Sequence, residues 1–211
     1  MRGKWIVLTA FLSLFLSCGT AKLADARAYF TRGEFHAAAE TYRKLYQKTP
    51  REQRALRGVI AFEMAENYRM LNQSPRALTA YRNAIRYNYP DTLQFYHLAR
   101  MLHREGSYEE AATAYRDFLE MVPGHPLATA GLQGVEMARA RQGKPERFAV
   151  QREEGFASNR SDFSPMLTER GDRLYFSSSR ETAQGEERSP VTGMKYSDLF
   201  YAETNVHGVW Q

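Results

Sequence analysis

A short pattern occurs three times between residues 33 and 123, and it restricts which folds this region can adopt. Each copy has a turn, then an alanine, a tyrosine four residues after the alanine, and a proline. The alanines are Ala38, Ala77 and Ala111, which are spaced 39 and 34 residues apart. Residues four apart share one face of an α-helix. A period near 34 with one small and one aromatic residue on that face indicates stacked helical hairpins.

The residues around each copy define the two helices of a hairpin. Gly33 and Gly106 suit the left-handed conformation that ends a helix, whereas Asn72 takes this place in the second copy. In the second helix, the alanine lets two helices approach closely and the tyrosine fills the space beside it. A proline ends each second helix, because it has no amide donor and clashes with the preceding turn. These prolines are Pro50, Pro90 and Pro123.

Two further features complete the predicted helical region. Five additional residues between the first and second copies are expected to lengthen a helix that runs from near Arg51 to Leu71. A further helix, near Pro126 to Arg141, has apolar residues at helical spacing and is expected to cap the array. We therefore predict an all-α solenoid over residues 19–141, with three helical hairpins and a capping helix.

The repeated residues resemble the tetratricopeptide repeat family. The third copy carries the resemblance most fully, at Phe95, Leu98, Ala99, Leu102, Gly106, Tyr108, Ala111, Tyr115, Phe118 and Pro123. The resemblance implies a concave groove that binds protein partners and is lined by the first helix of each hairpin. By register with the family, the groove residues are Arg27, Phe30, Phe62, Glu66, Arg69, Tyr96, Arg100, His103 and Arg104.

The composition of this predicted groove suggests a ligand. Arginine side chains beside aromatic rings suit an acidic or carboxylate-terminated peptide. The set does not match the lysine-and-asparagine clamp of chaperone-binding family members, so that specificity is not carried over. Two alternatives stay open. The side chains could form a solvated face, or they could pack against other parts of the chain or of an assembly.

The amino terminus has the features of an export signal. A basic start, Met1–Lys4, precedes an apolar run, Trp5–Ser17, which is too short for a membrane span of ~20 residues. Cys18, the single cysteine of the chain, follows this run and leaves no internal disulfide to form. The segment resembles a bacterial lipoprotein signal, which implies removal of residues 1–17 and a two-chain lipid anchor on Cys18. A plain secretory signal is the alternative.

The composition changes after the helical region. Residues 142–158 contain glycine, proline and many charges, and they are predicted to be a linker. Two aromatic runs, Leu174–Arg180 and Ser197–Ala202, indicate strands of one antiparallel sheet. Residues 159–211 resemble the TolB-like propeller repeat, which implies the first, incomplete blade of an all-β propeller. Because propellers use about four to eight blades, we expect the chain to be a fragment of a longer protein.

The order of these parts resembles a family of outer-membrane lipoproteins in the Bacteroidota, which includes the PorE component of type IX secretion. The resemblance implies a lipid-anchored scaffold that faces the periplasm and joins protein partners to the cell wall. Peptidoglycan binding would come only from an OmpA-like domain beyond residue 211. Two alternatives are a SusD-like lipoprotein for glycan uptake and the non-catalytic part of a propeller peptidase.

Signals for catalysis, metals or nucleic acid are weak. His97 and His103 are six residues apart, so they do not share a helix face as a metal pair would. Ser177–Ser179 lacks the Gly-x-Ser-x-Gly turn of a hydrolase nucleophile. The net charge of +5 is spread along the chain without a basic block. We predict no enzyme activity, no cofactor, no metal site and no nucleic-acid partner.

Overall fold

A computed structural model of the chain describes residues 22–144 and 149–211. The predicted signal sequence and Cys18 lie outside these residues. The chain divides into two compact units, one up to Lys144 and one from Pro145, and this boundary falls inside the predicted linker. Over the two described ranges, no helix combines the length and the apolar character needed to cross a lipid bilayer.

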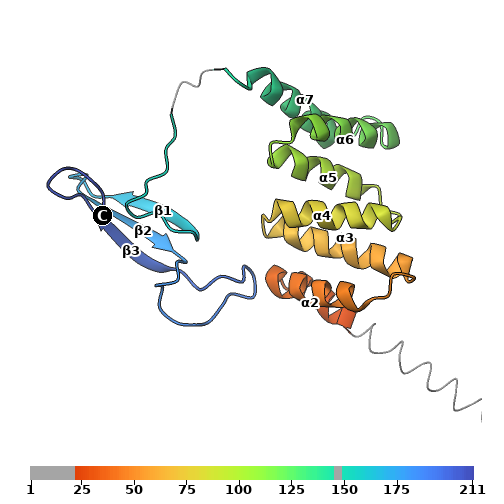
Figure 1. Cartoon of the computed structure of the whole chain (residues 1–211), viewed down its shortest axis with the longest axis horizontal. Helices are drawn as coiled ribbons and strands as arrows, with labels where there is room; N and C mark the ends of the chain where they lie inside the picture. Colours follow the sequence, from red (N-terminus) through yellow and green to blue (C-terminus); the bar gives the residue numbers. More distant parts are fainter. Residues whose placement is uncertain (1–21, 145–148) are drawn as a thin grey trace, which may run out of the picture. The chain divides into compact units, whose positions relative to one another are not determined.

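The first unit is a stack of helices, each packed on the next one along the chain (Figure 1). Residues 22–31 are helical and form the first layer with the helix that follows. The other helices are α2 (Phe35–Lys48), α3 (Arg54–Met70), α4 (Ser74–Arg86), α5 (Leu93–Arg104), α6 (Tyr108–Met121) and α7 (Pro126–Arg141). This arrangement confirms the predicted solenoid of helical hairpins.

The repeated alanines and tyrosines form the core of the stack. Ala38, Ala77 and Ala111 have no exposed surface, and the tyrosine four residues after each is at most 2% exposed. The small residues leave room for the neighbouring helix, and each tyrosine ring fills the remaining space. The turns between the helices also follow the prediction. Gly33 and Gly106 have φ of 76° and 75°, and Asn72 takes the same left-handed conformation with φ of 58°.

The lengths of the helices explain the uneven spacing of the copies. Helix α3 has 17 residues and α5 has 12, so the five additional residues lie within α3. Its observed bounds are close to those predicted from Arg51 to Leu71. Helix α7 has the predicted bounds and buries Ala128 and Val135 against α6. The His125 imidazole caps this helix, because its Nδ1 accepts a hydrogen bond of 3.2 Å from the Ala128 amide.

A buried arginine fixes the loop between α2 and α3. The Arg57 guanidinium donates hydrogen bonds to the carbonyl oxygens of Tyr46 and Thr49, at 3.1 and 2.5 Å. It also lies 3.9 Å from the centre of the Tyr46 ring, within cation–π range. Arg57 is only 9% exposed, so these contacts replace water at its Nη1, whereas its Nε is buried without a hydrogen-bond partner among the described residues.

The second unit contains a three-stranded antiparallel sheet in the order β1-β2-β3 (Figure 1). Its strands are β1 (Asp162–Leu167), β2 (Arg173–Ser178) and β3 (Asp198–Glu203). The two aromatic runs identified in the sequence form β2 and β3, and β1 is irregular between Phe163 and Met166. The sequence predicts an incomplete propeller blade over residues 159–211, and the described residues 149–211 form three strands.

The two faces of this sheet differ in how far their side chains are buried. On one face, Phe176 and Phe200 stack with their centroids 6.1 Å apart, and the Arg180 guanidinium lies 4.9 and 4.7 Å from the two rings. Phe176 is 3% exposed. On the other face, Tyr175 pairs with Met166 on β1 and with Tyr201 on β3, and Met166 is 63% exposed. The second face therefore exposes apolar side chains, and Arg173 lies beside them with its guanidinium 6.0 and 5.1 Å from the Tyr175 and Tyr201 rings.

Candidate functional site

A pocket of about 520 Å³ opens on the first helices of the hairpins, between the segment 22–31, α3 and α5. We call it the first-helix pocket. Four of the nine predicted groove residues line it: Arg27, Phe30, Phe62 and Glu66. It also contains residues outside the predicted groove set, chiefly Glu63, Asn67, Asp91, Leu93 and His97. Since its walls come from three hairpins, the pocket depends on the stacking of the repeats.

Arg27 is already paired within the pocket. Its Nη2 lies 2.6 Å from Oε1 of Glu63, and its Nε lies 3.0 Å from the same oxygen. The hydrogen bond from Arg27 to Glu63 raises the pKa of the guanidinium, although burial opposes this. Such a forked pair fixes both side chains in one geometry. Arg27 therefore supports a pocket carboxylate and is not an isolated cation that awaits an anionic ligand.

Glu66 lies at the centre of a second network. It accepts a hydrogen bond of 2.5 Å from Arg69 and a short one from the Tyr81 hydroxyl. Burial opposes ionisation of Glu66, but the hydrogen bonds from Arg69 and Tyr81 outweigh it and lower the pKa of the carboxyl. Burial, with the Glu66 charge, raises the pKa of Tyr81. Glu66 is therefore a carboxylate at neutral pH, and Tyr81 is its neutral donor.

His97 completes this side of the pocket. Its Nε2 lies 3.8 Å from Oε1 of Glu66, and its ring stacks on Tyr81 with centroids 6.0 Å apart. Burial lowers the pKa of His97 to about 4, and the Glu66 charge offsets only part of this effect. His97 is therefore neutral at physiological pH. Its Nδ1 is buried and has no hydrogen-bond partner within the described part of the chain.

The remaining predicted groove residues lie outside the pocket. Tyr96 is 6% exposed and packs between Phe118 and His125, with ring centroids 5.5 and 5.1 Å away. The structure thus places Tyr96 in the core and not on an open wall. Arg100 is exposed, with its guanidinium 5.6 Å from the centre of the Tyr96 ring.

The predicted residues at the end of α5 make contacts of their own. The His103 ring packs edge-on against Tyr108 and Tyr115, with centroids 6.0 and 6.2 Å away. Arg104 donates a hydrogen bond of 2.7 Å to Oδ1 of Asn72, in the turn between α3 and α4. Arg104 therefore links the second and third hairpins through its side chain.

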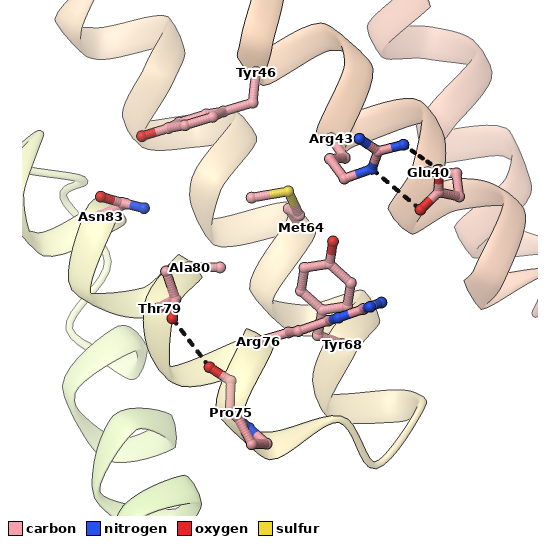
Figure 2. Close-up of a pocket in the computed structure, with 10 residues that line it drawn as sticks. All are labelled: Glu40, Arg43, Tyr46, Met64, Tyr68, Pro75, Arg76, Thr79, Ala80 and Asn83. Carbon is pink, nitrogen blue, oxygen red and sulfur yellow. Dashed lines mark hydrogen bonds and ion pairs between the residues drawn. The ribbon is translucent and has the colours of Figure 1, made fainter.

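A larger pocket, of about 750 Å³, lies on the other side of α3, between α2 and α4 (Figure 2). We call it the second-helix pocket. Figure 2 shows Arg43 paired with Glu40, at 2.6 Å, and Arg76 alongside Tyr68, with the guanidinium 5.8 Å from the ring centre. None of the buried, unpartnered side-chain atoms among the described residues belongs to this pocket. Because its larger volume is the only feature in its favour, the second-helix pocket is the weaker candidate for a ligand site.

The comparison with protein families decides how this fold is classified. A tetratricopeptide repeat model matches residues 7–59 and 62–126, more than half of the chain. The chain belongs to the tetratricopeptide repeat family. Proteins with these repeats are typically non-catalytic interaction modules. In the described residues, no group of three or more His, Cys, Asp or Glu side chains is placed to hold a metal ion.

Solved structures with tetratricopeptide repeats share this fold. One is the first such domain of Spaghetti (RPAP3), bound to the Hsp90 peptide SRMEEVD. It is 22% identical, with a TM-score of 0.51 over 58% of this chain and 93% of that one. Another is the myosin chaperone UNC-45 from C. elegans, in complex with an Hsp90 peptide. It is 18% identical, with a TM-score of 0.54, over 60% of this chain and 14% of the chaperone. No curated protein matches the chain in sequence.

The tetratricopeptide register did not identify every pocket residue. Glu63 follows Phe62 by one position, and it enters the pocket because Arg27 of the preceding hairpin holds its carboxylate. Asp91 lies in the turn before α5, where its Oδ1 accepts a hydrogen bond of 2.9 Å from the Leu93 amide. An aspartate just before a helix is a recognisable start signal. That signal could have drawn attention to Asp91, but not to its place beside α3.

Proposed function

We propose that the repeats of this chain bind an extended segment of a partner protein in the first-helix pocket. The observation that carries this proposal is the pocket itself, which spans three hairpins and combines aromatic rings with polar and charged side chains. Binding sites are typically concave and largely apolar, with a few well-placed polar groups. Two proteins that share the fold bind Hsp90 peptides. A similar mode of binding, without their specificity, is our expectation here.

A library of random peptides, displayed and selected on the full chain, would test this function. Phe30 is 37% exposed at the pocket, so Phe30→Ala should remove contact area while the helix stays folded. We expect the selected peptides to bind Phe30→Ala at least about tenfold more weakly, which corresponds to ~1.4 kcal/mol. Arg76→Ala, in the second-helix pocket, is the matched control and should not change binding. Peptides that respond to Arg76→Ala alone, or a selection without binders, would refute the assignment.

We also propose that the sheet is one blade of a β-propeller. The order of its turns and aromatic strands resembles a TolB-like repeat, and its three strands are antiparallel. The second face of the sheet supports the idea, since Leu199 and Tyr201 are 71% and 60% exposed there. A neighbouring blade would cover such a face, because blades of a propeller pack against each other around a central channel.

The cellular role that we propose is a lipid-anchored scaffold on the periplasmic side of the outer membrane, in type IX secretion or another envelope assembly. The support comes from the sequence: a basic start, an apolar run and Cys18 precede the repeats. Two acyl chains would suffice for stable anchoring. Peptidoglycan would be reached only through domains beyond residue 211.

The lipid anchor can be tested by measuring the intact mass of the natural gene product, purified from a membrane fraction. A diacylglyceryl adduct on Cys18 that is lost in Cys18→Ala, together with membrane attachment, would support this role. A secreted product that is cleaved but carries no lipid would contradict it.

A further inference from the structure

The polar atoms left without partners in the first-helix pocket are acceptors. Asn67 has no exposed surface, and its Nδ2 donates a hydrogen bond of 2.7 Å to the carbonyl of Glu63. Its Oδ1 is buried and has no donor within the described residues. His97 also has a buried acceptor atom without a donor among the described residues. A neutral imidazole has one donor and one acceptor nitrogen, and the Glu66 carboxylate favours the proton on Nε2. Nδ1 of His97 is then an acceptor without a donor.

The charges of the pocket point the same way. Three carboxylates line it, those of Glu63, Glu66 and Asp91, against one cation, Arg27. Arg27 is bound to Glu63, and Arg69 outside the pocket is bound to Glu66. Asp91 takes part in none of the ion pairs among the described residues. Among the residues that line the pocket, negative charge therefore exceeds positive charge.

The apolar walls of the pocket set a second requirement for its ligand. The rings of Phe30 and Phe62 and the side chain of Leu93 form walls of the pocket. Phe62 is held in place by Tyr89, stacked with ring centroids 4.4 Å apart. A methylene stem can lie along such walls while its charged end reaches polar groups. An aromatic face also attracts a cation electrostatically.

We propose that the first-helix pocket takes the cationic side chain, lysine or arginine, of the bound partner segment. Such a side chain has a charge and N–H donors that complement the pocket carboxylates, and a stem that suits the Phe30 and Phe62 rings. The inference rests on the proposed peptide-binding function and names its ligand class. It replaces the acidic preference expected from the arginines, because Arg27 and Arg69 are already engaged by carboxylates of this chain.

Four blocked heptapeptides would test the charge preference against the full chain. They share a background of glycine, serine and alanine, and they differ at the central residue: arginine, lysine, citrulline or glutamate. Binding is followed by the chemical shifts of labelled backbone and side-chain amides, including the Asn67 amide. We expect the arginine and lysine peptides to bind at least about tenfold more tightly than the citrulline and glutamate peptides. We also expect this advantage to shrink at high salt.

A matched pair of variants separates the pocket from the overall charge of the surface. Glu63→Gln removes a pocket carboxylate that is paired with Arg27 at 2.6 Å, and Glu40→Gln removes one paired with Arg43 at 2.6 Å in the second-helix pocket. Each variant loses one negative charge from one Glu–Arg pair. Only Glu63→Gln should weaken binding of the arginine peptide, by about tenfold or more.

The outcomes are distinct. Preferential binding of the glutamate or citrulline peptide at this pocket would overturn the inference and leave peptide binding intact. Equal loss in the two variants would overturn it as well, because the effect would then come from charge outside the pocket. The library selection with Phe30→Ala does not depend on charge, so its failure would reject the peptide site itself. Binders from that selection that show no enrichment in basic residues would reject only the inference.

Discussion

Acid should destabilise the repeat unit chiefly through one imidazole, that of His97. Burial lowers the pKa of this group to about 4, whereas an unfolded chain has a histidine pKa of about 6.5. Between these two values the unfolded state binds a proton that the folded state does not. The free energy of unfolding therefore falls as the pH decreases from about 6.5 towards 4.

The size of this effect follows from the two pKa values. Between pH 7.5 and pH 5.0, proton uptake by the unfolded chain at His97 should lower the free energy of unfolding by ~2 kcal/mol. The Glu66 carboxyl, whose pKa is lowered, acts only below its unfolded pKa of about 4.3, outside this interval. His103 adds to the trend with the same sign, since burial lowers its pKa too.

Urea unfolding followed by far-ultraviolet circular dichroism would measure the effect, because the helices dominate that signal. With a slope of about 2 kcal/mol per molar urea, the loss corresponds to a midpoint lower by about 1 M. His97→Phe keeps an aromatic ring next to Tyr81 and removes the titrating group. The difference between the wild type and this variant should therefore change by ~2 kcal/mol over the interval. His207→Asn removes an exposed imidazole from the other unit and serves as the control.

Parallel curves for the wild type and His97→Phe would refute the reasoning, since the acid sensitivity would then belong to other groups. A pH dependence of unfolding in His207→Asn that differs from that of the wild type would also assign acid sensitivity to a group other than His97.

Two further predictions concern packing in the repeat unit, and the same urea experiment measures both. In Gly131→Ala, the new Cβ would lie 2.5 Å from the buried Tyr115 ring, so overpacking of about 1–3 kcal/mol should exceed the gain in helix propensity of about 1 kcal/mol. In Gly134→Ala, the new Cβ would lie 3.2 Å from the partly buried imidazole of His103, which can move aside, so this variant should be neutral or stabilising. Equal destabilisation of both glycine variants would contradict the packing of α7. Arg57→Met should cost about 2–3 kcal/mol, because the carbonyl oxygens of Tyr46, in the last turn of α2, and of Thr49 lose their donor. Arg54→Met, at an exposed position, should cost less than 1 kcal/mol, and a similar loss in both variants would rule out this role of the buried guanidinium.

The helical repeats were predictable because their signals are local. An alanine and a tyrosine four positions apart, a turn residue and a proline are all read within about 20 residues. Even Asn72, which departs from the glycine of the other copies, takes the left-handed conformation that the register demands, with φ of 58°. Asparagine tolerates this conformation better than most residues.

The pocket was only partly predictable because its character depends on contacts between repeats. The sequence places Arg27 and Glu66 on the predicted groove, but it does not show that Arg27 binds Glu63, 36 residues away. That pair changes the expected ligand from an anion to a cation. Tyr96 lies in the core for the same kind of reason, since the turn before α7 brings His125 against its ring. Propensity and period contain no information on such long-range partners.

The tyrosine repeated in every hairpin has an optical consequence. A free phenol ionises near pH 10, and its ultraviolet absorbance changes when it does. Burial raises the pKa of Tyr115 to about 12, and burial also raises the pKa values of Tyr42 and Tyr81. In mild alkali, each of these phenols stays protonated while its hairpin is packed and ionises when that hairpin opens. The residue that closes each repeat thus serves as an intrinsic chromophore, by which the opening of the array can be followed without a label.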